Sequence, residues 1–130
     1  MDNQARHHAS TVKAALARSR ENIRTRTIQR LRDTVRETLE QPPRLAATVY
    51  LFGSWATGTF DGYSDTDLLV LAPDQATATE AQTRLLRIGD DVLALCDADW
   101  QSRIASGAPF WSRLSEERLP LVDTRDGERQ

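Results

Sequence analysis

Apolar residues recur at three- and four-residue spacing through the first third of the chain. A loose stripe of small and aliphatic residues is followed by a regular one, which consists of Ile28, Leu31, Val35 and Leu39. Residues spaced in this way share one face of a helix, so the pattern predicts a helix over residues 10–40. The pair Pro42-Pro43 ends it, because proline cannot continue the backbone hydrogen-bond ladder.

Short apolar runs rich in β-branched and aliphatic residues follow, and each is bounded by Gly, Pro, Ser or Asp. Runs of this length and composition are typical of buried strands. We expect strands at 46–52, 66–71 and 91–95, and a final edge strand at 120–122.

Helical patterns separate these strands. Residues 74–88 carry small and aliphatic residues on one side, and 98–118 indicate two short helices broken at 107–109. Their aromatic residues Trp100, Phe110 and Trp111 have helical spacing and are expected in the core. Strands that alternate with helices predict an α/β (α+β) domain with a small sheet.

A chain of 130 residues is expected to form one compact domain. We expect an N-terminal helical segment (1–44) that packs on the core, a core (45–122) and a polar tail (123–130). Its one cysteine excludes an internal disulfide framework. No apolar run approaches the roughly 20 residues that span a bilayer, and the start lacks an apolar signal segment, so we expect a cytoplasmic protein.

Charge is distributed unevenly around a net value of −2. Residues 1–40 carry a net charge of +4 and residues 41–130 carry −6, which is not the basic face of a general nucleic-acid binder. No Lys or Arg occurs between Arg44 and Arg84. Any polyanion bound by this stretch must be neutralised by backbone N–H groups, metal ions, or arginines from elsewhere in the fold or from a partner.

The stretch from Gly53 to Leu71, GSWATGTFDGYSDTDLLVL, carries the candidate chemistry. Gly53-Ser54 follows a predicted strand and opens a turn or helix, whose free N–H groups suit a phosphate. Asp65 and Asp67 are two residues apart at the start of the next strand and therefore point to one face. Two carboxylates beside a phosphate call for a cation, and hard oxygen ligands favour Mg²⁺ or Mn²⁺.

A third carboxylate stands at the start of the next predicted strand, where Asp90 and Asp91 are adjacent. Asp91 has the better phase, since it leads the apolar run, and Asp90 is the alternative. Three carboxylates on neighbouring strands suit a two-metal site for in-line nucleotidyl transfer.

These residues resemble the DNA-polymerase-beta-type nucleotidyltransferase superfamily, and the chain's size resembles its minimal nucleotidyltransferases. The resemblance covers residues 45–72 well and 73–122 loosely. The matching positions are Gly53, Ser54, Ala56, Gly58, Ser64, Asp65 and Asp67, followed by Leu68-Leu69-Val70.

The resemblance implies a small mixed β-sheet with helices packed on it and assigns roles to this chain's residues. Gly53 and Ser54 hold the triphosphate of ATP or another NTP, and Ser64 joins them at the nucleotide. Asp65 and Asp67 bind Mg²⁺ or Mn²⁺. Asp91, or Asp90 in its place, helps to bind one metal and acts as general base toward the acceptor hydroxyl.

The resemblance also implies an activity, which is Mg²⁺-dependent transfer of NMP, in the first place AMP from ATP, to a hydroxyl. Minimal nucleotidyltransferases of this type often act as antitoxins that modify a tyrosine of a HEPN-type toxin partner. The alternative is a catalytically weak binding module that neutralises a helical partner by contact, through the Arg-rich residues 13–36 or the aromatic C-terminal helices. A transferase acting on a small molecule, of the aminoglycoside type, is a third reading.

Overall fold

The first helix belongs to two compact units. The computed structural model describes the backbone of residues 2–61 and 63–125 and the side chains from residue 11 onward. Helix α1 (Asp2–Glu40) contributes to a first unit, Met1–Arg30, and to a second, Leu31–Gln130. The predicted helix over 10–40 is confirmed and begins earlier than expected. No helix in the described part of the chain has the length and apolarity that a membrane crossing needs.

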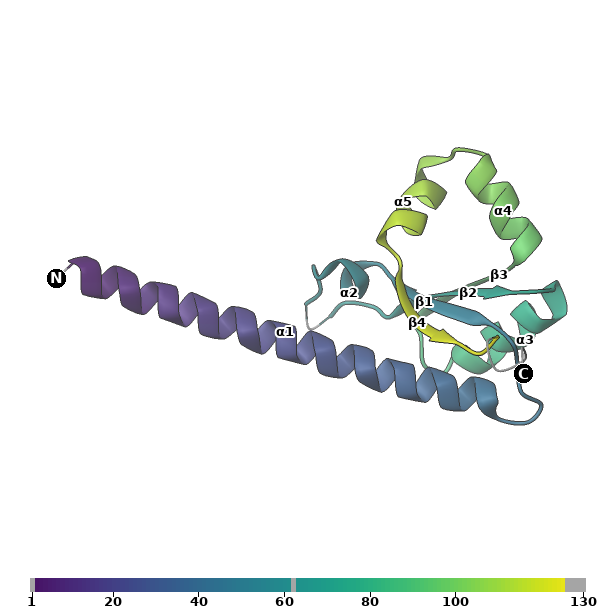
Figure 1. Ribbon diagram of the computed structural model, residues 1–130, viewed down its shortest axis with the longest axis horizontal. Helices are drawn as coiled ribbons and strands as arrows, with labels where there is room; N and C mark the ends of the chain where they lie inside the picture. The colour runs from purple at the N-terminus through teal and green to yellow at the C-terminus, as the bar shows by residue number, and fades with distance from the viewer. Residues whose placement is uncertain (1, 62, 126–130) are drawn as a thin grey trace. The chain divides into compact units, whose positions relative to one another are not determined.

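Four strands form one mixed sheet in the order β3-β2-β1-β4 (Figure 1). They are β1 (Thr48–Phe52), β2 (Asp67–Ala72), β3 (Asp91–Cys96) and β4 (Leu119–Asp123). Strand β1 is antiparallel to both of its neighbours, whereas β2 and β3 are parallel. All four predicted strands are confirmed, and so is the mixed α/β fold.

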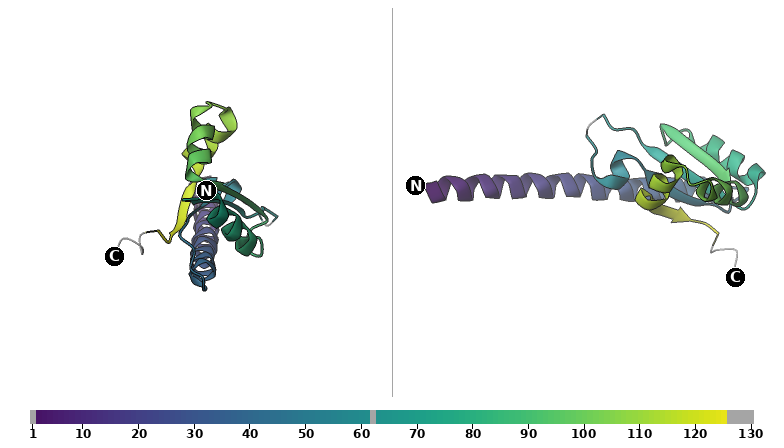
Figure 2. Two further views of the ribbon diagram at one scale, coloured as in Figure 1. Left: turned by 90° about the vertical axis from the view of Figure 1, so that its right-hand side faces the viewer. Right: turned by 90° about the horizontal axis from the view of Figure 1, so that it is seen from above.

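One face of the sheet is fully closed. Val49, Leu51, Leu68 and Val70 alternate toward this face, and none of them is exposed. Helix α3 (Gln75–Leu85) contacts β2 and β3 and buries its small apolar side there. The last turns of α1 lie on the same side of the sheet, as Figures 1 and 2 both show, and two of their aliphatic residues are buried.

The opposite face is covered by α4 (Asp97–Ala105) and α5 (Pro109–Glu117) (Figure 1). Trp100 and Leu114 pack there against Leu69 and Leu71, and the half-buried Trp111 joins them. The expectation that Trp100 belongs to the core is therefore confirmed. For Phe110 it is wrong: its ring packs only edge-on against Trp111, and 55% of the residue is exposed.

The C-terminal part of the core extends beyond the predicted boundary at residue 122. Strand β4 continues to Asp123, and the side chain of Thr124 is buried, where its hydroxyl donates to the carbonyl of Leu45 (2.7 Å) and accepts from the N–H of Ala47 (2.9 Å). Residues 123–125 thus belong to the core rather than to a polar tail, because their backbone is paired. Residues 126–130 of the predicted tail lie outside the described part.

Both edges of the sheet are interrupted. Pro120 lies on the edge strand β4 next to a register shift opposite β1, and its carbonyl accepts a hydrogen bond from Arg32 (3.2 Å). On the other edge strand, β3, the carbonyl of Val92 accepts from the side-chain amide of Gln82 (2.7 Å). Side chains therefore hold backbone groups of both edge strands.

Candidate active site

One row of the sheet collects the candidate residues. Phe52, the last residue of β1, pairs with Asp67, the first residue of β2, and Asp67 pairs in turn with Asp91, the first residue of β3. Paired residues point to the same face, which here is the face covered by α4 and α5. The topology therefore brings the turn at Gly53 and the carboxylates of β2 and β3 to one end of the sheet.

Gly53 lies directly against Asp67. Its backbone has φ 77° and ψ −155°, a region that is essentially restricted to glycine. A Cβ at this position would collide with the Asp67 carboxylate and would lie 3.4 Å from its Cγ. Two independent constraints thus require glycine here: the backbone conformation, and the close approach of the turn to Asp67.

The helix that follows is one turn long. Helix α2 comprises Ser54–Thr57, and the carbonyl of Gly53 accepts from the N–H groups of Ala56 and Thr57, both at 3.1 Å. The Ser54 hydroxyl forms no hydrogen bond with another described residue. The predicted phosphate-binding turn is present beside the carboxylates, and contact of Gly53 and Ser54 with a nucleotide stays a prediction.

The Asp67 carboxyl is perturbed by its surroundings. Its pKa is raised, first by burial and then by the negative charges of Asp91, Asp65 and Asp90, in that order. Both causes disfavour the ionised form. Asp65, Asp67 and Asp91, which we call the carboxylate row, therefore concentrate negative charge that a cation would offset.

Asp90 and Asp91 differ in their surroundings. The Asp90 carboxylate accepts a hydrogen bond from the backbone N–H of Thr66 (2.8 Å) and so fixes the start of β2. Asp91 is exposed, is the register partner of Asp67 and shares its face. Asp90 thus has a structural hydrogen bond and Asp91 is the register partner of Asp67, and the choice of Asp91 as the third carboxylate stays a prediction.

The acidic residues do not form a finished metal cage. Within the part of the chain that the structure describes, no group of three or more His, Cys, Asp or Glu side chains is close enough to hold a metal ion. Mg²⁺ is commonly held by one or two carboxylates together with substrate phosphates and water, all hard oxygen ligands. Asp67 and Asp91, with Asp65 at the entrance to β2, fit such a partial site.

The loop between α2 and β2 is held by local bonds. Ser64 accepts a hydrogen bond from the N–H of Asp61 (2.8 Å), and its carbonyl accepts from Nε1 of Trp55 (3.4 Å). Trp55 stacks on Phe60 with ring centroids 4.1 Å apart. Asp61 accepts from the N–H of Tyr63 (2.8 Å), a local hydrogen bond that is typical of turns. Ser64 thus has a structural partner, and its contact with a nucleotide stays a prediction.

Comparison with known proteins agrees with this arrangement. A family model described as the nucleotidyltransferase domain matches residues 28–111, which is more than half of the chain. The chain belongs to this family. The family is part of the polymerase-beta-type superfamily, and its membership supports transfer of a nucleoside monophosphate. No curated protein and no solved structure matched the chain.

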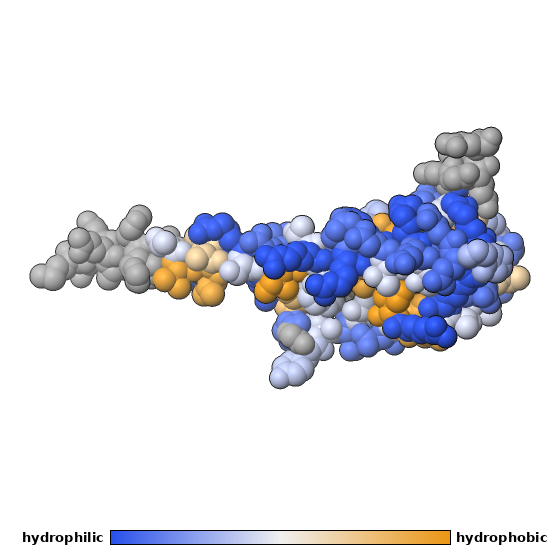
Figure 3. Space-filling view, turned by 90° about the horizontal axis from the view of Figure 1, so that it is seen from below, coloured by the Kyte–Doolittle hydropathy of each residue, from blue (hydrophilic) through white to orange (hydrophobic). Residues whose placement is uncertain are grey.

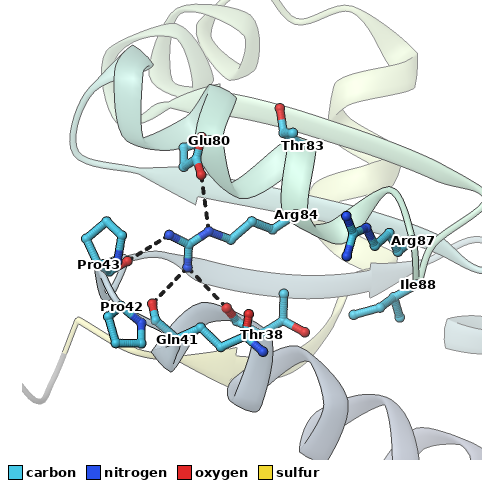
Figure 4. A pocket seen from close by; sticks show the side chains of 9 residues that line it. All are labelled: Thr38, Gln41, Pro42, Pro43, Glu80, Thr83, Arg84, Arg87 and Ile88. Atoms are coloured by element: carbon cyan, nitrogen blue, oxygen red, sulfur yellow. Dashed lines mark hydrogen bonds and ion pairs between the residues drawn. The ribbon is translucent and has the colours of Figure 1, made fainter.

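The larger of two pockets in this nucleotidyltransferase, about 480 Å³, has none of the candidate carboxylates among its lining residues (Figure 4). Arg84 crosses it from α3 and donates to the carbonyls of Thr38 (3.2 Å), Gln41 (3.0 Å) and Pro43 (2.8 Å). These carbonyls belong to the end of α1 and the turn after it, where backbone acceptors lack helical partners. Arg84 therefore has a structural role.

A smaller pocket of about 180 Å³ adjoins the carboxylate row of the nucleotidyltransferase. Its walls come from the end of β1 and from α5, and they comprise Phe52, Gly53, Phe110, Arg113, Leu114 and Glu117. No local sequence pattern predicts that α5 lies beside the Gly53 turn, because the two segments are far apart along the chain. The helical spacing of Phe110, Arg113 and Glu117 was the available signal.

Proposed function

We propose that this chain is a Mg²⁺-dependent nucleotidyltransferase that moves AMP from ATP to a hydroxyl acceptor in the cytoplasm. We further propose that the acceptor is a tyrosine of a HEPN-type toxin partner. Membership of the nucleotidyltransferase family supports the reaction class. The choice of AMP, magnesium and a toxin tyrosine is supported by the resemblance of the Gly53–Val70 stretch to minimal nucleotidyltransferases.

The reaction forms one bond and breaks one. The acceptor oxygen attacks the α-phosphorus of ATP, the bond between that phosphorus and the bridging oxygen to the β-phosphate breaks, and pyrophosphate leaves. The proton of the acceptor hydroxyl passes to a base. A divalent cation, when bound, neutralises phosphate charge and lowers the pKa of the attacking hydroxyl.

The residues of the row divide this work. Asp65 and Asp67 hold the cation, and the Gly53-Ser54 turn faces the triphosphate with its backbone. Asp91 takes the proton of the acceptor and shares in holding the cation, since it is exposed and lies beside Asp67. Asp90 positions the row through its bond to Thr66.

One observation carries the proposal. The register Phe52–Asp67–Asp91 places a glycine-only turn against the first carboxylate and the second carboxylate beside it on the same face. A glycine turn at the start of a helix, next to paired carboxylates, is suited to a metal-bound polyphosphate.

Calorimetric titration with MgATP tests the site directly. The full chain and Asp67→Asn are compared, each with Mg²⁺ and with excess EDTA. We expect binding by the wild type that requires Mg²⁺ and that the substitution abolishes. Binding of equal strength in Asp67→Asn, or in EDTA, would contradict the role of the carboxylates.

Transfer is tested by the position of the label. ATP labelled at the α-phosphate should mark the acceptor in a mixture with the co-expressed partner, whereas ATP labelled at the γ-phosphate should not. A tyrosine-to-phenylalanine change at the modified position of the partner should remove the label. Label that arrives only from the γ-phosphate would identify a different reaction.

A second candidate function is a binding module that acts by contact. It is favoured by the absence of a finished metal cage among the described residues and by the surface of α1. Residues 11–30 carry six basic side chains against one acidic one, and they expose Val12 (45%), Leu16 (65%) and Ile23 (52%). Figure 3 shows apolar side chains among hydrophilic ones along this helix.

Paired substitutions separate the two candidates. Asp65→Asn with Asp67→Asn removes the metal ligands, while Leu16→Glu with Ile23→Glu disrupts the exposed apolar stripe of α1. The readout is whether the chain protects cells that express the toxin partner. If the chain inactivates its partner covalently, the first pair of substitutions abolishes this protection. A contact inhibitor keeps protection with the first pair and loses it with the second.

A further inference from the structure

A nucleotide bound at the carboxylate row brings charge that the row does not balance. The triphosphate is strongly anionic, and the row itself contains Asp65, Asp67 and Asp91. The sequence around the Gly53 turn supplies no cation, since Lys and Arg are absent between Arg44 and Arg84. A basic side chain from another part of the fold would complete the charge balance.

The pocket beside Gly53 contains one such side chain. Residues 110, 113, 114 and 117 share one face of α5, because they are spaced by three, four and seven positions. Leu114 anchors this face in the core, and Arg113 stands next to it at the pocket. Gly53 lines this pocket together with Arg113, and a Cβ on Gly53 would collide with the Asp67 carboxylate, so the pocket of Arg113 and the carboxylates meet at Gly53.

Arg113 is also available, unlike most arginines of the core. Within the described residues it has neither a hydrogen bond nor an ion pair. Of the other arginines that the structure describes after residue 40, all but Arg87, which lines the larger pocket, have a partner. Arg44 donates to the Thr124 carbonyl and Arg84 to three carbonyls. Arg103 lies over Trp111, Arg118 lies over Tyr50 and Trp100, and Arg125 pairs with Asp97.

We propose that Arg113 binds the phosphates of the nucleotide and that the pocket between α5 and the Phe52–Gly53 turn seats it. This inference rests on the proposed function, because it assigns a residue to the same nucleotide site. Arg113 lies far from the Gly53 turn in the sequence but lines the same pocket, and it supplies the positive charge that the residues around the turn lack. Phe52 and the exposed ring of Phe110 form an apolar wall for the nucleoside part.

Glu117 provides an internal contrast. It lies one helical turn from Arg113 on the same pocket and carries the opposite charge. If phosphates approach this face of α5, removal of the Arg113 charge weakens binding and removal of the Glu117 charge strengthens it. Two neighbouring substitutions of similar size thus have effects of opposite sign.

The test is titration of the full chain with MgATP and with magnesium tripolyphosphate, which has no nucleoside. Arg113→Gln should weaken binding of both by about 10- to 100-fold, the range of a charge-assisted hydrogen bond. Glu117→Gln should tighten both about two- to fivefold, because that charge is partly screened by solvent. Arg103→Gln is the matched control: it lies over Trp111, outside the pocket, and should leave both affinities unchanged.

The outcomes separate this inference from the proposed function. Wild-type binding that Arg113→Gln retains overturns the inference and leaves the function standing, and so does loss of MgATP binding without loss of tripolyphosphate binding. Failure of the wild type to bind either ligand overturns the proposed function as well. Arg113 is exposed, so the variant should fold, and its melting temperature verifies this. Arg113→Lys should restore part of the affinity.

Discussion

Substitution of Gly53 by alanine tests whether the turn and Asp67 form one unit. The backbone at Gly53, with φ 77° and ψ −155°, costs a non-glycine residue about 1–3 kcal/mol. The added Cβ also collides with the Asp67 carboxylate, and overpacking of this kind costs roughly 1–3 kcal/mol more. Alanine restricts the unfolded chain and returns about 0.4–1 kcal/mol. We expect a net loss in the free energy of unfolding of about 3 kcal/mol.

Gly58→Ala is the matched control for this change. Gly58 also has a positive φ, 86°, but a Cβ there meets no atom within 4 Å. It carries the backbone strain alone, for which we expect a net loss of about 1 kcal/mol after the gain from the unfolded chain. The difference of about 2 kcal/mol corresponds to a gap of roughly 8 °C in melting temperature for a domain near this size.

Urea denaturation of the two variants measures the difference, and MgATP titration measures its effect on the site. Gly53→Ala should also lose Mg²⁺-dependent binding, because Asp67 must move, whereas Gly58→Ala should retain it. Equal destabilisation by the two changes would refute the reasoning, since the collision with Asp67 would then cost nothing.

Three further predictions concern charge and helix ends. The pKa of Asp67 is raised, first through burial and then through its acidic neighbours, so ionisation of Asp67 destabilises the folded state as pH rises. In EDTA at pH 7, the melting temperature of Asp67→Asn should therefore exceed that of the wild type. The difference in melting temperature should disappear near pH 3, where the carboxyl is protonated. Asp74 behaves oppositely, because the N–H of Thr77 donates to its carboxylate at the start of α3 and lowers its pKa. The stability lost in Asp74→Ala should therefore be largest near neutral pH. The loss should vanish as the pH falls through this lowered pKa. In urea, Arg84→Ala should lose about 2–4 kcal/mol by leaving carbonyls at the end of α1 unpaired, while Arg87→Ala in the same pocket should stay within about 0.5 kcal/mol; equal losses would contradict the structural role of Arg84.

The strands and the carboxylates could be predicted because their signals are local. The apolar run after Asp67 predicts a strand and places Asp67 at its start, and the run after Asp91 does the same for Asp91. The phase of the apolar run favours Asp91 over Asp90, and this choice stays a prediction, although Asp90 accepts a hydrogen bond from the N–H of Thr66. Only the register of β2 against β3 places the two carboxylates side by side.

The residues that the sequence did not single out depend on contacts between distant segments. Arg113 and Phe110 line one pocket with Gly53 because α5 packs over the end of β1. The sequence pattern of α5 does not distinguish the helix face that lines this pocket from a face that is buried in the core. Phe110 was expected in the core for this reason. Arg84 is an ordinary surface arginine by sequence, and its role follows from the carbonyls that the turn after α1 presents to it.

The interrupted edges of the sheet bear on how the protein behaves at high concentration. An open edge strand offers unpaired backbone groups to a second molecule and is a common start of fibrillar aggregates. Here Pro120 removes an N–H donor from β4, and Gln82 occupies a carbonyl on β3. Pairing of either edge strand with a second molecule is therefore hindered at these positions.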